Sequence, residues 1–260
     1  MDLVNGKRVV VTGAASDIGA AIANCLTQEG AHVIGIDIRE TNECHEFFEA
    51  DLGKQASIDA LLGALPEGID GLANVAGLPP TMSAPAVLKV NLVGLKYLTK
   101  QLAGRMNDGG SIVNLASLAG ANWAASLDQV HAANNLDFES VEDFVEKEQI
   151  EAQPGRSYFL GKEALIVWTM QNRWTWRNRG IRMNAVSPGA VDTPILADFL
   201  KTLGKKADEN RKVMDRPATP EDIAPMVAFL LSDQAGWFRG ANIALDGGQF
   251  AHMTASRFGF

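Results

Sequence analysis

A short β-branched run followed by a turn of small residues is the feature that most restricts how this chain can fold. Val9, Val10 and Val11 stand together with no polar residue between them, which is typical of a parallel strand buried on both faces. The turn at residues 12–19 leads into a segment with helical apolar spacing, which Gly30 ends. A strand, a small-residue turn and a helix in this order predict the first unit of an α/β sheet.

The same alternation of strand and helix continues along the chain. Short apolar runs predict strands at residues 8–12, 32–37, 46–50, 69–75, 111–116, 181–186 and 242–245. Helical spacing predicts helices at residues 18–29, 55–65, 85–106, 158–177 and 219–231. We therefore expect an α/β protein with a doubly wound, seven-stranded parallel sheet of the Rossmann type, in a single domain over residues 1–260.

Composition and charge exclude several other classes of protein. Of the 260 residues, 47% are hydrophobic, which suffices for a buried core, and no run approaches the roughly 18 apolar residues of a membrane span. The formal net charge of −8 disfavours nucleic acid and an anionic membrane surface as partners.

Cysteine and histidine usage points to a reducing compartment and to no metal site. The two cysteines, Cys25 and Cys44, form neither a CxxC motif nor a disulfide framework. The N-terminus lacks the pattern of a secretory signal, so we expect a cytoplasmic protein. The four histidines show no metal-ligand spacing, and no bound metal is expected.

The small-residue turn at residues 12–19 predicts a phosphate-binding site. Small residues let a phosphate approach the backbone, and the following helix offers free N–H groups and the positive end of its dipole. Asp37 ends the next predicted strand, where a carboxylate hydrogen-bonds the adenosine ribose of a dinucleotide and repels a 2′-phosphate. This pair favours NAD over NADP, although Arg39 could accept a phosphate.

Tyr158 and Lys162 form a candidate acid–base pair. They lie four positions apart on a predicted helix and therefore share one face. A free tyrosine has a pKa of about 10, and a neighbouring ammonium group lowers it toward the working range. Ser117 ends a predicted strand, at the edge of the sheet where open α/β proteins bind ligands.

Taken together, the motifs resemble the short-chain dehydrogenase/reductase family of the single-domain type. The resemblance runs from about Lys7 to Gly248. Beyond the turn, Asp37 and the Tyr158–Lys162 pair, it rests on Asp51-Leu52, Asn74-Val75-Ala76-Gly77, Asn91, Ser117, Pro188-Gly189 with Thr193, and Asp246-Gly247-Gly248.

The resemblance implies a role for each matched residue. Asn91, Ser117, Tyr158 and Lys162 match the catalytic tetrad, with Tyr158 as acid–base, Lys162 on the ribose and Asn91 holding a water. Cofactor binding is implied for Gly13, Ser16, Asp17, Ile18, Gly19, Asp37, Asp51, Leu52, Asn74, Ala76, Gly77, Tyr158, Lys162, Pro188, Val191 and Thr193. Among these, Asp51 and Leu52 would hold the adenine. Asn74, Ala76 and Gly77 would line the central cleft, and Val191 and Thr193 would fix the nicotinamide carboxamide.

Two departures from the family pattern stand out. Asp17 replaces a glycine of the turn, which places a carboxylate near the expected pyrophosphate unless it caps the helix instead. The gap from Ser117 to Tyr158 spans 41 positions, far more than is usual in the family. The extra stretch, at about residues 120–153, has the pattern of one or two amphipathic helices. With residues 35–39, it resembles the bacterial 3α-hydroxysteroid dehydrogenase/carbonyl reductase group.

The expected activity is the NAD(H)-dependent interconversion of a secondary alcohol and a ketone. An apolar segment at about residues 194–216 is expected to form a substrate lid, which favours a bulky hydrophobic substrate such as a steroid or an aromatic or alicyclic ketone. A reductase of 3-oxoacyl thioesters and a non-catalytic dinucleotide-binding protein are the alternatives. The resemblance also implies a homodimer or homotetramer.

Overall fold

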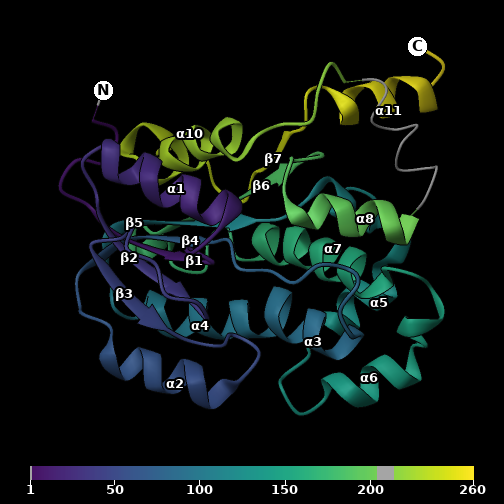
Figure 1. Ribbon diagram of the computed structural model, residues 1–260, viewed down its shortest axis with the longest axis horizontal. Helices are drawn as coiled ribbons and strands as arrows, with labels where there is room; N and C mark the ends of the chain where they lie inside the picture. Colours follow the sequence, from purple (N-terminus) through teal and green to yellow (C-terminus); the bar gives the residue numbers. More distant parts are fainter. Residues whose placement is uncertain (1, 204–213) are drawn as a thin grey trace.

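Seven parallel strands form one sheet in the computed structural model, which describes residues 2–203 and 214–260. The strands are β1 (Arg8–Thr12), β2 (His32–Asp37), β3 (Glu46–Glu49), β4 (Ile69–Asn74), β5 (Met106–Leu115), β6 (Arg182–Pro188) and β7 (Asn242–Leu245). Their order is β3-β2-β1-β4-β5-β6-β7 (Figure 1). The order reverses between β1 and β4, and ligands bind outside the strand ends at such a point. The predicted fold class is confirmed.

Helices cover both faces of the sheet. The longer ones are α1 (Asp17–Gln28), α2 (Gln55–Ala64), α4 (Leu95–Ala103), α7 (Arg156–Gln171), α8 (Pro194–Leu203), α10 (Pro220–Leu231) and α11 (Gln249–Arg257). In Figure 1, α1 and α10 lie above the sheet, and α2 and α4 lie below it. The inner strands such as β1 and β6 are thereby buried on both sides, which is why their sequences contain nearly continuous apolar runs, whereas the edge strands β3 and β7 are only partly buried.

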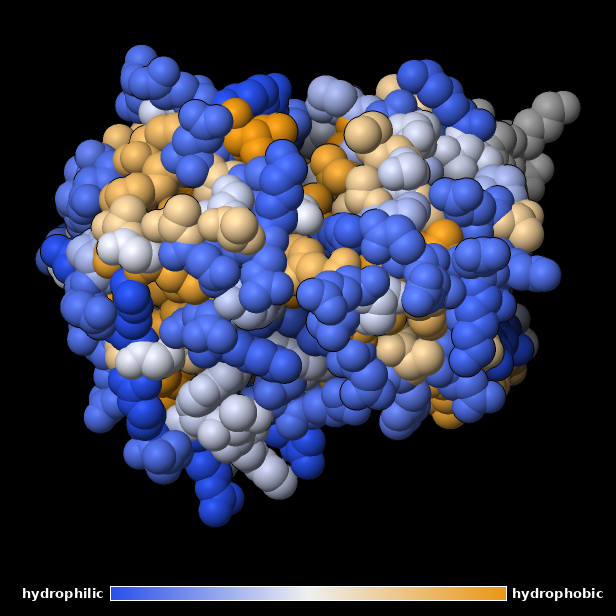
Figure 2. Space-filling model, turned by 90° about the horizontal axis from the view of Figure 1, so that it is seen from below, coloured by the Kyte–Doolittle hydropathy of each residue, from blue (hydrophilic) through white to orange (hydrophobic). Residues whose placement is uncertain are grey.

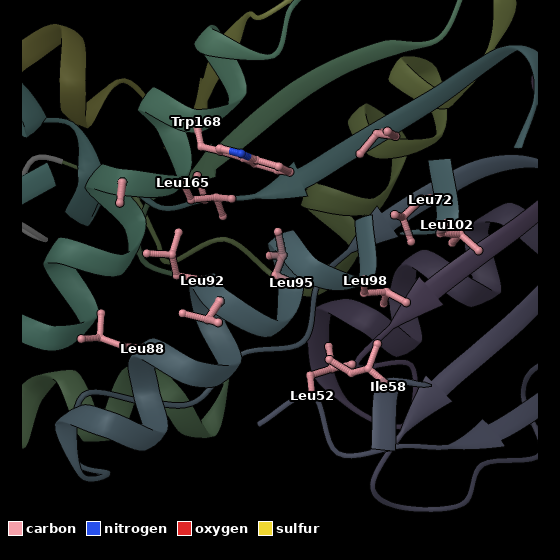
Figure 3. Close-up of a cluster of buried hydrophobic side chains, with 14 of the residues drawn as sticks. Leu52, Ile58, Leu72, Leu88, Leu92, Leu95, Leu98, Leu102, Leu165 and Trp168 are labelled. Carbon is pink, nitrogen blue, oxygen red and sulfur yellow. The ribbon is translucent and has the colours of Figure 1, made fainter. Parts of the chain in front are cut away.

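Each face of the sheet has its own hydrophobic core. On the α1–α10 face, the core of this side includes Ile22, Leu26, Ile223 and Val227 together with Val9 and Val11 of β1. On the opposite face, a row of leucines from α4 and the segment before it meets α7, as Figure 3 shows. That row comprises Leu88, Leu92, Leu95, Leu98 and Leu102. Burial of this kind contributes about 25 cal/mol per Å² of apolar surface, so the two cores hold the helices that position the site.

The single helix predicted at residues 85–106 is wrong. The segment consists of α3 (Ala84–Leu88), a π-helical turn (Lys89–Gly94) and α4, and Met106 already belongs to β5. The spacing of the leucines gives no sign of the wider π-helical turn, because leucines before and after the turn face the same hydrophobic core. A Cβ on Gly94 would lie 1.9 Å from the Leu52 carbonyl oxygen, so this turn packs directly against the loop after β3.

The largest of the remaining boundary differences are at the start of β5 and the end of α7. β5 begins at Met106 rather than at residue 111, because Met106 pairs with Ile69 before an irregularity in the register. α7 ends at Gln171 rather than at residue 177, and Trp174 beyond it is 55% exposed.

The stretch at residues 120–153 is helical, as expected. It holds α5 (Leu127–Ala133) and α6 (Val141–Lys147). Arg156 at the start of α7 donates two hydrogen bonds to the Gln129 side chain, which joins α5 to α7. On the other side, Glu142 of α6 forms an ion pair with Lys89 at 2.5 Å. The insertion is therefore fixed to the helices on either side of the ligand-binding edge.

Most of the face seen from below carries hydrophilic side chains, with apolar residues in smaller patches between them (Figure 2). Among the described helices, none is long and apolar enough to cross a membrane. The large apolar side chains that are most exposed are Trp237, at 97%, and Phe258 and Phe260 in the C-terminal segment, at 67% and 96%.

Candidate active site

A cavity of about 950 Å³ opens at the carboxyl ends of the strands. Ligand pockets are commonly about 300–1,000 Å³, so this one has room for a large ligand. Most residues expected at the site line it: Gly13, Ser16, Asp17, Ile18, Gly19, Asp37, Asp51, Leu52, Ala76, Gly77, Ser117, Tyr158, Lys162, Pro188, Val191 and Thr193. Asn74 and Asn91 do not.

Two glycines shape the turn between β1 and α1. Any other residue at either position would force the neighbouring backbone to shift. Gly13 has φ +71°, and a Cβ there would lie 2.8 Å from the Cα of Ala76. A Cβ on Gly19 would lie 1.9 Å from the Gly13 carbonyl oxygen. The turn thus leaves an open cradle at the start of α1, where N–H groups and the helix dipole favour a pyrophosphate. These residues fit a dinucleotide.

Asp17 does not cap α1. The N-cap is Ser16, and no side-chain capping bond is made there. Asp17 instead adopts φ +51°, a left-handed conformation that costs little for glycine and more for other residues. The residue is exposed and lines the cavity. Of the two alternatives for Asp17, capping of α1 is therefore not what the structure shows, and the residue lines the cavity at the start of α1.

Asp37 and Arg39 are both tied to the same turn. The Asp37 carboxylate accepts hydrogen bonds from the backbone N–H groups of Ala15 and Arg39, each at 3.1 Å. The Arg39 guanidinium donates to the Ser16 hydroxyl at 2.7 Å. The carboxylate is thus held at the end of β2, and the guanidinium lies beside it at the cavity edge.

Asp51 and Leu52 form the wall beyond Asp37. The Asp51 carboxylate accepts from the Gly53 N–H at 2.9 Å and pairs with Lys54, also at 2.9 Å. These contacts hold the pKa of Asp51 below its ordinary value, with the Lys54 hydrogen bond as the main cause. Leu52 is 5% exposed and offers an apolar surface to the cavity.

Ser117, Tyr158 and Lys162 meet where β5 ends against α7. A Cβ on Gly120 would lie 2.7 Å from the Lys162 carbonyl, so the turn after Ser117 packs directly on α7. The Lys162 ammonium donates to the Leu115 carbonyl at 2.6 Å and lies 5.6 Å from the centroid of the Tyr158 ring. The three side chains therefore share one corner of the cavity.

Burial changes the acid–base properties of this pair. It raises the pKa of Tyr158 to about 12, while a hydrogen bond with Ser117 acts in the opposite direction. It also lowers the pKa of Lys162 to about 8, since a buried ammonium loses its hydration. The expectation that Lys162 brings the Tyr158 pKa down to the working range does not describe the net effect here, because desolvation is the larger contribution.

Asn91 and Asn74 lie behind the cavity wall. The Asn91 amide is engaged by the Leu78 backbone, accepting from its N–H at 2.7 Å and donating to its carbonyl at 3.0 Å. Asn91 sits in the π-helical turn and so fixes the loop after β4. Asn74 donates to Thr99 and to Asn114 within the core. The expectation that Asn74 lines the cofactor cleft is wrong, because its side chain is turned into the sheet.

The far end of the cavity is apolar and comes largely from α8 and α11. Phe199 of α8 packs edge-on against Tyr158, with ring centroids 4.8 Å apart. Ile195 and Leu196 also line the cavity. Residues 204–213 of the expected lid lie outside the described residues.

Several lining residues were not predicted from the sequence. Gln249 and Met253 of α11 have no motif that marks them. Glu142 and Lys89 come from the insertion and the π-helical turn. Across residues 2–203 and 214–260, no cluster of three or more potential metal ligands occurs.

The fold and the site define a class of protein. A doubly wound sheet, a phosphate cradle of glycines and a Ser–Tyr–Lys corner in the same cavity are the parts of a dinucleotide-dependent oxidoreductase. Two family models match, described as short chain dehydrogenase over residues 7–128 and as Enoyl-(Acyl carrier protein) reductase over residues 143–249. The chain belongs to the short-chain dehydrogenase/reductase family.

Named relatives agree with this assignment. The chain is 40% identical to a coniferyl-alcohol dehydrogenase of Pseudomonas sp. (strain HR199 / DSM 7063), over 95% of this chain and 98% of the relative. It is 31% identical to the 3-alpha-hydroxysteroid dehydrogenase/carbonyl reductase of Comamonas testosteroni, over 96% and 99%.

A solved structure is similar over the same extent. The 3-alpha-hydroxysteroid dehydrogenase from Pseudomonas sp. B-0831, complexed with NADH, has a TM-score of 0.83 and 31% identity, covering 96% of this chain and 99% of that one. The resemblance to the family, and to its hydroxysteroid dehydrogenase group, is thereby confirmed.

Proposed function

We propose that this enzyme interconverts an alcohol and a ketone by hydride transfer with NAD(H). The observation that carries the proposal is the corner formed by Ser117, Tyr158 and Lys162 in a cavity continuous with the glycine cradle at Gly13. The corner supplies a proton donor and acceptor, and the cradle holds a dinucleotide whose nicotinamide supplies or accepts the hydride.

The cofactor is held by residues that line the cavity from Leu52 through the glycine turn to Val191 and Thr193. The turn at Gly13 and Gly19 takes the pyrophosphate, and Asp37 takes the adenosine ribose. Leu52 contacts the adenine, while Val191 and Thr193 fix the carboxamide. The relative complexed with NADH supports this assignment, and the Asp37 carboxylate disfavours a 2′-phosphate.

In the reaction, the Tyr158 hydroxyl gives its proton to the carbonyl oxygen during reduction and takes it back during oxidation. Ser117 hydrogen-bonds the same oxygen and the Tyr158 hydroxyl. The Lys162 ammonium favours the phenolate and binds the ribose. Asn91 does not line the cavity but hydrogen-bonds the Leu78 backbone, and we propose that it positions the loop after β4. Catalysis is mainly orientation together with one acid–base group.

The substrate is a bulky hydrophobic alcohol or ketone. Apolar side chains of α8 and α11 form the far end of the cavity. The relative named after 3-alpha-hydroxysteroids supports a secondary hydroxyl on a steroid or alicyclic ring as the first choice. The relative named after coniferyl alcohol supports an aromatic skeleton, although its alcohol is primary and would be oxidised to an aldehyde. Neither a thioester reductase nor a non-catalytic dinucleotide-binding protein is favoured by a particular observation.

The test is a turnover assay with NADH and NADPH and a panel of ring ketones and alcohols. We expect NADH-dependent reduction of ring ketones, with a higher kcat/KM for NADH than for NADPH. An Asp37→Ser variant should reduce that ratio, because the like-charge contact is removed. Equal values for both cofactors in the unmodified enzyme would mean that Arg39 governs the choice.

We also propose that the enzyme is a cytoplasmic homodimer or homotetramer. The cysteines are both free. Trp237 is 97% exposed, and Phe258 and Phe260 are also exposed, which is unusual for large apolar side chains unless a second copy covers them. Light scattering of the purified enzyme tests this, and a monomer at micromolar concentration would contradict it.

A further inference from the structure

The start of α11 is held against the loop that lines the nicotinamide end of the cavity. A Cβ on Gly189 would lie 2.9 Å from the Asp246 side chain, so the two segments touch. The Asp246 carboxylate accepts hydrogen bonds from the N–H groups of Gly248, at 3.0 Å, and Phe250, at 2.7 Å. These bonds fix the first turn of α11, which lies at the same end of the molecule as α8 (Figure 1).

Two residues of α11 line the cavity, one turn apart. Gln249 is 8% exposed and Met253 is 46% exposed. At a spacing of four they share one face of the helix, with Gln249 deeper and Met253 nearer the mouth. Phe199 and Ile195 of α8 line the same cavity.

The Gln249 side chain makes no hydrogen bond with any other residue of the described chain, although its backbone N–H donates to Asp246. A primary amide carries two donor hydrogens and an acceptor oxygen. The Gln249 amide is not among the buried side-chain polar atoms of the described chain that lack a partner, so it remains open to water in the cavity. A ligand that fills this part of the cavity displaces that water, and the amide then needs a polar partner on the ligand. An apolar side chain would serve better here if the only need were to contact a hydrocarbon.

We propose that Gln249 is a specificity-determining residue that hydrogen-bonds a second oxygen of the substrate. The inference rests on the proposed function. It narrows the substrate to an apolar ring skeleton that carries a hydroxyl, ether or carbonyl oxygen in addition to the reacting group. The apolar lining binds the skeleton, and the amide selects among skeletons of similar shape, since a buried hydrogen-bonding group discriminates strongly against an analogue that lacks its partner.

The experiment compares matched substrates in the unmodified enzyme and in Gln249→Leu, which keeps the side-chain size and removes the amide. The pairs are coniferyl and cinnamyl alcohol, and a 3α-hydroxysteroid with and without an oxygen at the far end of its rings. We expect the unmodified enzyme to favour the oxygenated member of at least one pair by about tenfold in kcat/KM, the worth of one hydrogen bond. Gln249→Leu should abolish that preference, mainly through KM, and leave the other member within about twofold.

Other results would overturn the inference. If Gln249→Leu keeps the preference, or if kcat/KM falls equally for both members of a pair, the amide does not hydrogen-bond the second oxygen of the substrate. A weakened affinity for NADH, measured by fluorescence titration, would show that it contacts the cofactor. His252→Ala, an exposed position on the same helix that does not line the cavity, is the control and should change none of these values.

Failure of the proposed function is distinguishable from failure of this inference. If no member of either pair is turned over, binding of the same pairs to the enzyme–NADH complex is measured by quenching of NADH fluorescence. Selective binding of the oxygenated member, lost in Gln249→Leu, supports the role of Gln249 even then. Absence of selective binding overturns it.

Discussion

The cavity has two halves that are built in different ways. The cofactor half is bounded by the β1–α1 turn and the ends of β2 and β4, and backbone geometry sets its shape: Gly13 and Gly19 are there because a Cβ would collide with the chain. The substrate half is bounded by α8 and α11, and side chains such as Phe199 and Met253 set its shape. Changes in the first half should therefore disturb binding and folding together, whereas changes in the second should alter substrate choice.

The Ser117–Tyr158–Lys162 corner lies where the two halves meet, and its loss should have the largest effect. Tyr158→Phe keeps the ring that packs on Phe199 and removes only the hydroxyl. We expect kcat to fall by roughly 10² or more, the range typical of a lost general acid or base, with NADH affinity nearly unchanged. Steady-state kinetics and NADH fluorescence titration measure the two quantities.

The other tyrosine of the chain provides the control. Tyr97 lies on α4, away from the cavity, and its hydroxyl donates to Asp59 at 2.7 Å. Tyr97→Phe should leave kcat unchanged. Near-normal turnover in Tyr158→Phe would mean that another group transfers the proton.

Removing the Ser117 hydroxyl should have the next largest effect. Its hydrogen bond lowers the pKa of Tyr158, so Ser117→Ala should raise that pKa further above its ordinary value. Alcohol oxidation needs the phenolate, and its rate should therefore begin to rise at a higher pH than in the unmodified enzyme. Ketone reduction needs the protonated form and should stay active to higher pH. The loss in kcat at neutral pH should be roughly 10- to 100-fold, the worth of a hydrogen bond to a charged group.

The pH profiles of both directions check this prediction. A shift of the oxidation profile to lower pH would contradict the assigned hydrogen bond. A fall in kcat with no shift at all would mean that Ser117 acts on the substrate oxygen alone.

These two halves also differ in how far the sequence predicts them. Gly13 and Gly19 could be predicted because a close backbone approach allows only glycine. Asp37 could be predicted because an acidic residue directly after the second strand is typical of a ribose-binding position. The π-helical turn around Asn91 could not, because the leucine stripe at Leu88, Leu92 and Leu95 looks the same for an uninterrupted helix.

The substrate half carries no comparable sequence signal. Gln249 and Met253 follow the last glycines of the chain, and only the packing of α11 brings them to the cavity. The orientation of Asn74 depends likewise on its neighbours in three dimensions, since its amide can equally face a ligand or a buried threonine.

Within the cofactor half, the effect of the close approach between Gly13 and Ala76 can be measured separately from the effect of the positive φ angle of Gly13. Gly13 and Gly6 both have φ +71°, but a Cβ on Gly6 would meet nothing within 4 Å. Gly13→Ala should weaken NADH binding by about tenfold and destabilise the fold by about 1–3 kcal/mol, the cost of a strained backbone residue. Gly6→Ala should share part of the destabilisation and leave NADH affinity unchanged. Thermal unfolding and NADH titration of both variants test this, and equal effects on affinity would show that the Ala76 contact does not matter.

Asp17 provides the smallest effect and the finest test of the cofactor half, because there a side chain occupies a left-handed position. Asp17→Gly removes both the strained conformation and the charge, so it should raise stability by about 0.5–1 kcal/mol and tighten NADH by a few fold, since the pyrophosphate no longer faces a carboxylate. Asp17→Asn removes the charge but keeps a residue that tolerates this conformation. It should therefore increase the affinity for NADH to a similar degree without the gain in stability.

Asp17→Ala should lower the stability of the fold, because alanine tolerates the left-handed region less well than aspartate. If Asp17→Gly and Asp17→Asn bind NADH no more tightly than the unmodified enzyme, the carboxylate turns away from the phosphates, and the strain at residue 17 alone distinguishes this turn from one with glycine there.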